Sequence, residues 1–456
     1  MPVFSLGPAQ TEWCAELRAL AAERLRPLAE KADPGRVNRP LIAALGELGL
    51  LGRLFGDTGG AGGRVGGVRG GAAGAGALEL CLLRESLAQG CTEAETALAL
   101  QGLGAYPIVQ AGTDSQRARW LPEVSAGRAV AAFALSEPGA GSDAAALALR
   151  AEPDGDGWLL TGEKRWISNA PEADFYTVFA RTDGAGRGST GRGSMGDGSE
   201  GAGGREGAGG RAGAGVVRAG ARGITAFLVP AGRPGLTGTP IEMLAPHAIG
   251  ALDFDSVPVT RDDVLGEVGH GFRVAMNTLN LFRPSVGAFA VGMAQAALAA
   301  TLEHTADRTA FGGPLKELQA VAHQVAEMAT RTEAARLLVY AAAEAYDSGA
   351  PDVPRRSAMA KLFATETAQY VVDSAVQLHG ARALQRGHPL EHLYREVRAP
   401  RIYEGATEVQ RTIIAKELYR ERYEREQRYG YEQPPAERET APVPAPVPVP
   451  DEEANA

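Results

Sequence analysis

Cysteine is scarce in this chain, and its spacing excludes two common structural devices. Only three of the 456 residues are cysteines, Cys14, Cys81 and Cys91, and no two of them form a CxxC pair. An odd number without that spacing provides neither a disulfide framework nor a zinc site. We therefore expect three buried thiols in a reducing compartment.

The chain also lacks long apolar runs and an excess of positive charge. Its formal net charge is -9, whereas a nucleic-acid-binding protein needs a basic surface. No uninterrupted run of about 18 apolar residues is present, so we predict no membrane span. Residues 1–14 have neither the basic nor the apolar region of a signal peptide. The composition predicts a cytoplasmic globular protein, long enough for two or three domains.

The order of predicted structure along the chain is helical, then β, then helical. Residues 10–55 and 77–127 carry apolar side chains every three or four positions, on either side of a glycine-rich loop at 56–76. From residue 129, short runs rich in aromatic and β-branched residues predict antiparallel strands. Residues 184–223 are almost all Gly, Ala, Arg and Ser, which predicts a disordered loop between two strands.

The second half of the chain is dominated by long helical patterns. They cover residues 274–308, 318–349, 354–380 and 406–427. Four such helices predict an antiparallel bundle. Residues 433–456 are rich in proline and predict a disordered tail.

Three short motifs have residue types that suit a flat, phosphate-bearing ligand. SEPGAGSD, residues 136–143, follows a predicted strand, and its glycines allow close approach of the backbone to a ligand. In KRWISNA, Trp166 lies beside hydroxyl and amide groups, which suits stacking on a heterocycle. In RTAFG, Arg308 leaves a helix, and its guanidinium suits a pyrophosphate. A β-turn, a core tryptophan and a surface arginine near a helix end are the structural alternatives.

Two further motifs carry candidate metal ligands or catalytic carboxylates. HPLEH, residues 388–392, matches an HxxEH metalloprotease pattern, but Pro389 permits only a helix start there and no third ligand is evident. We therefore predict no metal site. RIYEGATEVQR, residues 401–411, holds Glu404 and Glu408 four positions apart, a spacing most often found on a solvated helix face.

Taken together and in this order, SEPGAGSD, KRWISNA, RTAFG, QLHG and RIYEGATEVQR resemble the acyl-CoA dehydrogenase family. The resemblance implies an α+β multi-domain fold: an N-terminal α-helical domain at 1–128, a central antiparallel β-barrel-like domain at 129–262, and a C-terminal four-helix bundle at 263–432. It also implies bound FAD, an acyl-CoA substrate, an electron-transfer flavoprotein as electron acceptor, and a homo-oligomer, either tetramer or dimer.

The resemblance also assigns roles to residues. Glu404 matches the catalytic base, which removes the α-proton of a thioester while a β-hydride goes to flavin N5. A smaller family branch takes its base from the helix that here runs from Asn280 to Arg283, where no Glu or Asp stands. Substrate contacts are implied for Ser142, Arg283 and Gly405. FAD contacts are implied for Phe133, Leu135, Ser136, Trp166, Ser168, Gln377 and Gly380, and, from a neighbouring subunit, for Arg308, Phe311 and Gln319.

Three alanines depart from the family pattern. Ala381 and Ala383 stand where the family usually has glycines after QLHG, and Ala406 stands where it has a threonine that hydrogen-bonds FAD. These alanines suggest a non-catalytic homologue as one alternative to an acyl-CoA dehydrogenase. Two others stay open independently of them: a dehydrogenase of acyl groups on an acyl carrier protein, and a flavin oxidase or monooxygenase on the same fold.

Overall fold

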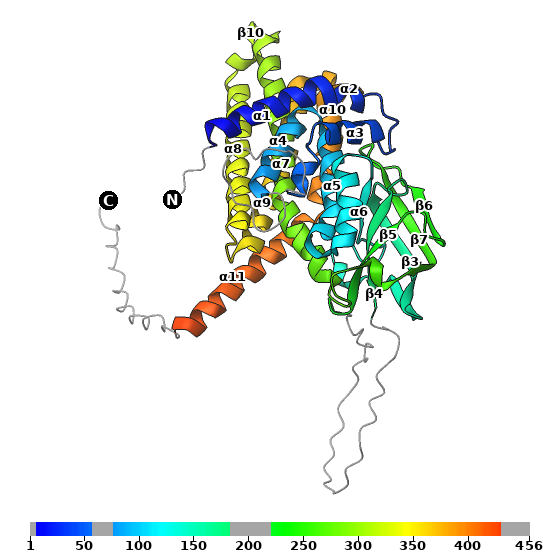
Figure 1. The fold of residues 1–456 in the computed structure, drawn as a ribbon. Helices are drawn as coiled ribbons and strands as arrows, with labels where there is room; N and C mark the ends of the chain where they lie inside the picture. The colour runs from blue at the N-terminus through cyan, green and yellow to red at the C-terminus, as the bar shows by residue number, and fades with distance from the viewer. Residues whose placement is uncertain (1–5, 57–75, 183–219, 430–456) are drawn as a thin grey trace, which may run out of the picture.

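The computed structural model describes residues 6–56, 76–182 and 220–429. Apart from their ends, the predicted glycine-rich segments at 56–76 and 184–223 lie outside these residues, and so does the predicted tail at 433–456. In the described part, a body of helices and a β-sheet lie side by side, and the long C-terminal helices are furthest from the sheet (Figure 1).

The N-terminal region is helical, as predicted. Leu17, Ala21 and Leu25 form a fully buried stripe at a spacing of four residues along the first helical rod. Asn38 begins a later helix, because its Oδ1 accepts a hydrogen bond from Leu41 N at 3.0 Å. The elements are α1 (Pro8–Leu20), η1 (Ala21–Leu25), α2 (Arg26–Ala29), α3 (Arg39–Glu47), η2 (Gly52–Leu54), α4 (Ala77–Gly90), α5 (Thr92–Ala111) and α6 (Asp114–Ser125).

The central region forms one eight-stranded sheet in the order β6-β7-β3-β2-β4-β5-β8, with β1 paired to β4. Five strands confirm the sequence prediction: β1 (Ala131–Ala134), β3 (Gly157–Ser168), β4 (Phe175–Arg181), β5 (Ile224–Pro230) and β7 (Ile249–Val259). Three others were not predicted. β2 (Arg150–Asp154) and β6 (Leu236–Pro240) have too few apolar residues to be recognised, and β8 (Val264–Leu265) is only two residues long. Short helices η3 (Ala144–Ala146) and η4 (Arg261–Asp263) complete the region.

The sheet is mostly antiparallel, as predicted, but β4 departs from the pattern. Both β1 and β2 run parallel to it. Parallel neighbours need long connections instead of tight hairpins, and the segments between these strands are long enough to provide them.

Helix α5 fixes the sheet to the helical body. The side chain of Gln101 donates to Ala129 O and accepts from Ala131 N, both at 2.7 Å, so it bonds the chain on entry to β1. Gly104 permits close packing, because a Cβ there would lie 2.7 Å from Ala132 N. Its carbonyl accepts from the Thr177 hydroxyl on β4 at 2.9 Å. The amino end of β1 is thereby held at a defined place beside α5.

The C-terminal region confirms the four predicted long helices and adds one that was not predicted. Helices α7, α8 and α9 pack against one another, and α4 packs on α7 and α8. The last helix, α11, packs on α9 and leaves the bundle obliquely (Figure 1). The elements are α7 (Gly271–Asp307), β9 (Thr309–Ala310), β10 (Gly313–Pro314), η5 (Leu315–Glu317), α8 (Gln319–Asp347), α9 (Val353–His379), η6 (Gly380–Leu384), α10 (Pro389–Glu396), η7 (Ala399–Arg401) and α11 (Thr407–Tyr429).

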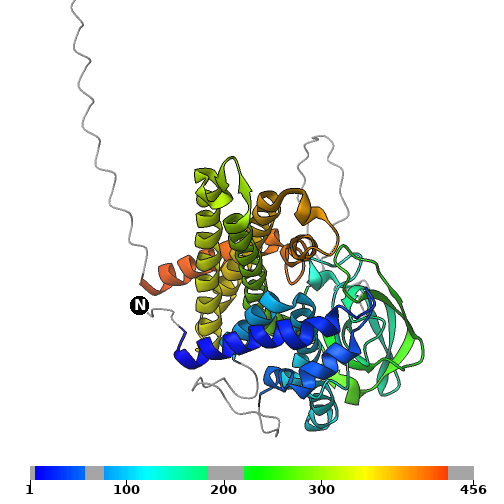
Figure 2. The ribbon, with the colours of Figure 1, turned by 90° about the horizontal axis from the view of Figure 1, so that it is seen from above.

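Helix α7 runs through the middle of this arrangement (Figure 2). By length and composition it is the one described helix that could cross a membrane, with a mean hydropathy of 1.5 over its most apolar window. However, 67% of that window is buried inside the molecule, which is the pattern of a core helix. The length and hydropathy of α7 are therefore only weak evidence for a membrane span.

Candidate active site

Glu404 lies in a tight turn between η7 and α11. Its φ is 50° and that of Gly405 is 95°, so two successive residues adopt left-handed conformations. Only glycine adopts such a conformation freely, and a side chain at position 404 is strained. This turn is therefore stable only because surrounding side chains hold its backbone in place.

Three side chains from three helices hold the turn through its carbonyl groups. Lys361 Nζ on α9 donates to Gly405 O at 2.7 Å, and Gln410 Nε2 on α11 donates to the same oxygen at 2.9 Å. Glu404 O accepts from Gln410 Nε2 at 3.3 Å and from Arg283 Nε at 3.4 Å. Lys361 and Gln410 are completely buried. The backbone of Glu404 is thus fixed, while its carboxyl group is left out of these bonds.

The carboxyl group of Glu404 has the environment of a general base. Its Oε2 is buried and has no hydrogen-bond partner among the described residues. Burial raises the pKa of Glu404, and the positive charges of Arg84, Lys361 and Arg283 offset only part of that effect. A carboxylate with a raised pKa is a stronger base than one in water. Glu408, in contrast, is exposed on α11, as the sequence analysis expected.

Arg283 connects this turn to a cavity. Its Nη1 donates to Asn280 Oδ1 at 3.1 Å. Asn280 lines a cavity of about 310 Å³ together with Gln110, Asn277 and Tyr346. The structure therefore brings the predicted substrate residues Arg283 and Gly405 to Glu404. The third, Ser142, is exposed in the turn after β1.

The predicted flavin contacts of the sheet also meet. Ser136 O, just after β1, accepts from Arg165 N on β3 at 3.0 Å, which joins the two motifs. The register of β3 against β7 shifts between Lys164 and Ile167, and Trp166 in that irregularity has a φ of 57°. Such a bulge re-aims a side chain. Trp166 is 47% exposed, which contradicts the core-tryptophan alternative and leaves its ring free to stack. The other members of this group are Phe133, Leu135 and Ser168.

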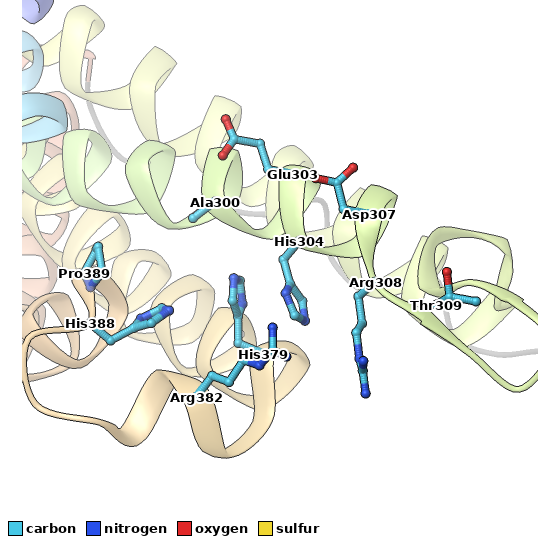
Figure 3. A pocket seen from close by; sticks show the side chains of 10 residues that line it. All are labelled: Ala300, Glu303, His304, Asp307, Arg308, Thr309, His379, Arg382, His388 and Pro389. Carbon is cyan, nitrogen blue, oxygen red and sulfur yellow. The ribbon is translucent and has the colours of Figure 1, made fainter.

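A second group of predicted flavin contacts lies around a cavity of about 710 Å³, whose lining includes Arg308 and Arg382 as well as Glu303 and Asp307 (Figure 3). Arg308, directly after α7, and His379, which belongs to the QLHG motif at the end of α9, both line it. The rings of His304 and His379 stack with centroids 4.1 Å apart. Desolvation and the neighbouring cations lower the pKa values of His304 and His388. The guanidinium groups of Arg308 and Arg382 in this lining fit the diphosphate of a dinucleotide.

The remaining predicted contacts lie near this cavity but outside its lining. Gln377 and Gly380 belong to the same α9–η6 segment as His379, and Gln319 begins α8. Phe311 lies at the tip of the β9–β10 hairpin and is 92% exposed. No residue of the sheet lines the cavity within the described chain. Within one chain, the two groups of predicted flavin contacts therefore do not share this cavity.

Sequence reasoning missed the buried charges near Glu404. Arg84 on α4 and Glu95 on α5 form an ion pair with side chains 3% and 0% exposed. Lys361, also missed, lies within the apolar stretch SAMAKLFA, as Arg84 lies within CLLRESLA. A charge inside an apolar helical pattern was the available signal, since charges are almost never fully buried unless they are paired.

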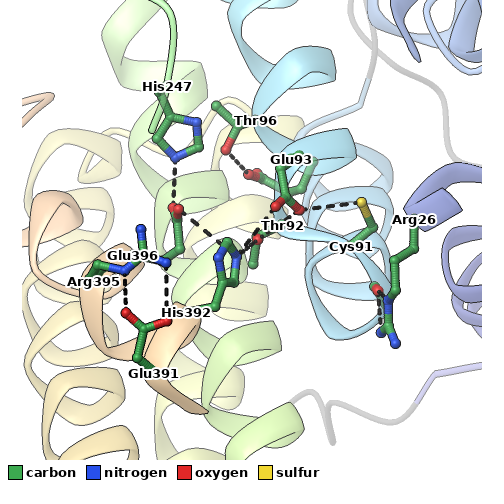
Figure 4. A network of polar contacts seen from close by, with 12 residues as sticks. Arg26, Cys91, Thr92, Glu93, Thr96, His247, Glu391, His392, Arg395 and Glu396 are labelled. Carbon is green, nitrogen blue, oxygen red and sulfur yellow. Dashed lines mark hydrogen bonds and ion pairs between the residues drawn. The ribbon is translucent and has the colours of Figure 1, made fainter. Parts of the chain in front are cut away.

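The HPLEH motif contributes to a polar contact between α5 and α10 (Figure 4). His388 caps α10 by accepting from Leu390 N at 3.2 Å. His392 Nε2 lies 2.6 Å from the hydroxyl of Thr92. The next turn of α10 presents Glu396, whose carboxylate lies 2.7 Å from His247 Nε2 in the β6–β7 loop. The two histidines of the motif thus have different partners.

The three buried thiols expected from the sequence are confirmed: Cys14, Cys81 and Cys91 are free and buried.

Comparison with known proteins covers most of the chain. Sequence models of the acyl-CoA dehydrogenase N-terminal, middle and C-terminal domains match residues 7–128, 132–195 and 269–419. Probable acyl-CoA dehydrogenase FadE25 of Mycobacterium tuberculosis is 33% identical over 92% of this chain and 97% of its own. The mitochondrial short-chain specific acyl-CoA dehydrogenase of Bos taurus is 34% identical over 88% of both chains. The structure of butyryl-CoA dehydrogenase from Megasphaera elsdenii superposes with a TM-score of 0.77 at 31% identity, covering 92% of this chain and all of that one.

Proposed function

Since this chain belongs to the acyl-CoA dehydrogenase family, we propose that it catalyses FAD-dependent α,β-dehydrogenation of an acyl-CoA thioester, with Glu404 as the base. The observation that carries the proposal is the Glu404 carboxyl group: its Oε2 is buried and has no hydrogen-bond partner among the described residues, and its pKa is raised. An acyl-carrier-protein thioester is the alternative substrate.

In this proposal, the residues at the turn have two roles, removal of the proton and positioning of the base. Glu404 Oε2 accepts the α-proton of the thioester, because its carboxylate is desolvated and basic. Arg283, Lys361 and Gln410 hold the backbone of the turn, so that the carboxylate meets the α-carbon without reorganisation. Bound FAD supplies the acceptor for the β-hydride.

The chemistry of two groups of residues supports FAD as the cofactor. Trp166 and its neighbours at the end of β1 offer an exposed ring and hydroxyl groups for a flat heterocycle. The cavity beside Arg308 offers cations for a diphosphate. Because one chain does not bring the two groups to one cavity, we propose that the cavity of one copy serves the flavin of another. This requires a homo-oligomer, a dimer or tetramer.

We propose an electron-transfer flavoprotein as the acceptor of the electrons of the reduced flavin. Cytoplasmic placement and the domain boundaries at 128/129 and 262/263 stay predictions.

The proposed base gives the reaction a definite pH dependence. The pKa of Glu404 is raised, and only the deprotonated carboxylate removes a proton. We therefore expect the rate of flavin bleaching by substrate to rise with pH, through an apparent pKa above the ordinary glutamate value of about 4.3, and then to level off. Stopped-flow bleaching from pH 5 to 9, with flavin content checked at each pH, measures this. A rate that falls over the range would contradict the assignment.

The cavity beside Arg308 predicts the effect of removing this arginine. Arg308→Ala removes a guanidinium from the proposed diphosphate site, and a charge-assisted hydrogen bond is worth about 1.5–3 kcal/mol. We expect flavin binding to weaken about 10- to 100-fold, on the scale of about 1.4 kcal/mol per tenfold change. The flavin-to-protein absorbance ratio after gel filtration measures it. Arg331→Ala is the control, because Arg331 stacks on Tyr370 outside this cavity. Equal retention in both variants would remove Arg308 from the site.

A further inference from the structure

Lys164, on β3, is a fully buried lysine that joins the two motifs proposed to contact the flavin ring. Its ammonium group donates to Glu137 Oε1 at 2.7 Å and to Leu135 O at 3.0 Å. Glu137 belongs to SEPGAGSD and Lys164 belongs to KRWISNA. The Lys164 side chain is 0% exposed, and charges are almost never buried to this extent unless they are paired. This lysine therefore ties the segment after β1 to β3 from within the molecule.

The carboxylate of Glu137 holds the ammonium group in place. Its Oε2 accepts from Ala148 N at 2.5 Å, and its Oε1 accepts from Leu149 N at 3.0 Å as well as from Lys164. Burial lowers the pKa of Lys164 to about 8, and the charge of Glu137 offsets part of that effect. The amine is therefore mainly protonated at neutral pH, and its positive charge has a fixed position.

The bond to Leu135 O sets the direction of the peptide group between Leu135 and Ser136. This peptide bond is trans, so its C=O and its N–H point in opposite directions. Because the carbonyl of Leu135 points to the ammonium group of Lys164, the N–H of Ser136 points away from it. Ser136 is half-buried, and its N–H has no hydrogen-bond partner within the described part of the chain. This N–H is therefore available to a ligand.

The lysine also lies where β3 departs from regular pairing. Lys164 is paired with Leu252 of β7, and the register shifts directly after it. Trp166 lies in that irregularity with its ring exposed, and Arg165 N donates to Ser136 O at 3.0 Å. The charge of Lys164 therefore lies between the two motifs whose residues are proposed to contact the flavin ring.

A fixed ammonium group polarises the peptide group to which it donates. Hydrogen bonds in a chain strengthen one another, so the bond from Lys164 to Leu135 O makes the N–H of Ser136 a stronger donor. Hydrogen bonds and charges near the ring nitrogens of a flavin tune its electron affinity. Because a reduced ring carries more negative charge than an oxidised ring, a stronger donor stabilises the reduced form more.

We propose that Lys164 is a positioning residue of the flavin site: through the peptide group between Leu135 and Ser136, it aims a polarised N–H at the ring and increases the preference of the site for the reduced cofactor. This inference rests on the FAD binding proposed above. Lys164 itself needs no contact with flavin or substrate, and Glu137 keeps its ammonium group in place and charged.

The midpoint reduction potential of the bound flavin tests the proposal. Lys164→Met keeps most of the side-chain volume but removes the charge and the bond to Leu135 O. We expect the potential to fall by about 30 mV or more, which is a tenfold loss of preference for the reduced ring in a two-electron couple. Equilibrium reduction against a reference dye measures it on protein loaded with FAD. A purely structural lysine would lower thermal stability and flavin retention but leave the potential unchanged.

Two further variants keep the test decisive. Glu137→Gln/Lys164→Met removes both charges, so no buried anion is left unpaired if the single variant fails to fold. This double variant also lacks the bond to Leu135 O and should show the same fall in potential. Arg233→Met is the matched control, because the guanidinium of Arg233, between β5 and β6, pairs with Asp263 at 2.6 Å. Its flavin potential should equal that of the parent.

Three results would overturn the role of Lys164. They are an unchanged potential in the Lys164 variants, an equal fall in the Arg233 variant, and failure of the parent or of both Lys164 variants to bind FAD at saturating concentration. If the potential falls as expected but no thioester bleaches the parent flavin, the proposed dehydrogenation is overturned and the role of Lys164 stands.

Discussion

Replacing Glu404 by glutamine is expected to slow substrate-dependent flavin bleaching by about 10²- to 10⁴-fold, the contribution of a positioned general base. The amide has nearly the shape of the carboxyl group but cannot accept the α-proton. Because the turn is held through the carbonyl groups of Glu404 and Gly405, the side-chain change leaves those hydrogen bonds in place. Flavin content and thermal stability should stay at parent values, and single-turnover bleaching under anaerobic conditions measures the loss.

Glu408→Gln is the matched control. Glu408 lies four residues further along, exposed on α11, with Arg411 as a partner at 3.9 Å. The same chemical change there removes a solvated charge, and the bleaching rate should stay within twofold of the parent. Bleaching at the parent rate in the Glu404 variant would remove this residue from the role of base.

Gly405→Ala is expected to have the second large effect. A Cβ at position 405 would lie 2.3 Å from Gln410 Nε2, and the φ of 95° is itself unfavourable for alanine. Strain at such a position costs about 1–3 kcal/mol, and Gln410 must also give up its place between the two carbonyl groups. The base then shifts relative to the α-carbon. A displacement of about 1 Å is enough to cost roughly 10²-fold in rate.

The control for Gly405→Ala is Gly155→Ala. Gly155 also has a positive φ, of 56°, but a Cβ there meets nothing within 4 Å, in the turn between β2 and β3. That variant shows the cost of backbone strain without the clash. Bleaching and thermal unfolding of both variants separate a displaced base from a general loss of stability. If both variants bleach at the parent rate, the turn does not position the base.

The sequence was enough to predict those elements whose local pattern is strong. In these elements, the local sequence alone shows the pattern of apolar residues. They are the four long C-terminal helices and the strands β1, β3, β4, β5 and β7. Strands β2 and β6 do not, because RAEPD and LTGTP are mostly polar or exposed and depend on their neighbours for pairing. Local pattern also cannot give the parallel pairing of β1 with β4, since that depends on contacts between distant segments.

The candidate site likewise combines features that the local sequence predicts with features that depend on contacts between distant segments. The motif around Glu404 identified the carboxylate, and Gly405 indicated the turn. Apart from Gln410 on α11, the side chains that hold and tune that turn come from α4, α7 and α9, more than 40 residues away along the chain. Arg84 and Lys361 lie within locally apolar stretches of α4 and α9, and only folding shows which groups bond to them.

Anaerobic addition of acyl-CoA thioesters to the flavin-loaded protein tests the central claim most directly. The predicted result is loss of the absorbance of the oxidised flavin with at least one thioester, together with formation of the α,β-unsaturated product in an amount equal to the flavin bleached. If every CoA and carrier-protein thioester leaves the flavin oxidised while dithionite reduces it, the chain is not an acyl-thioester dehydrogenase.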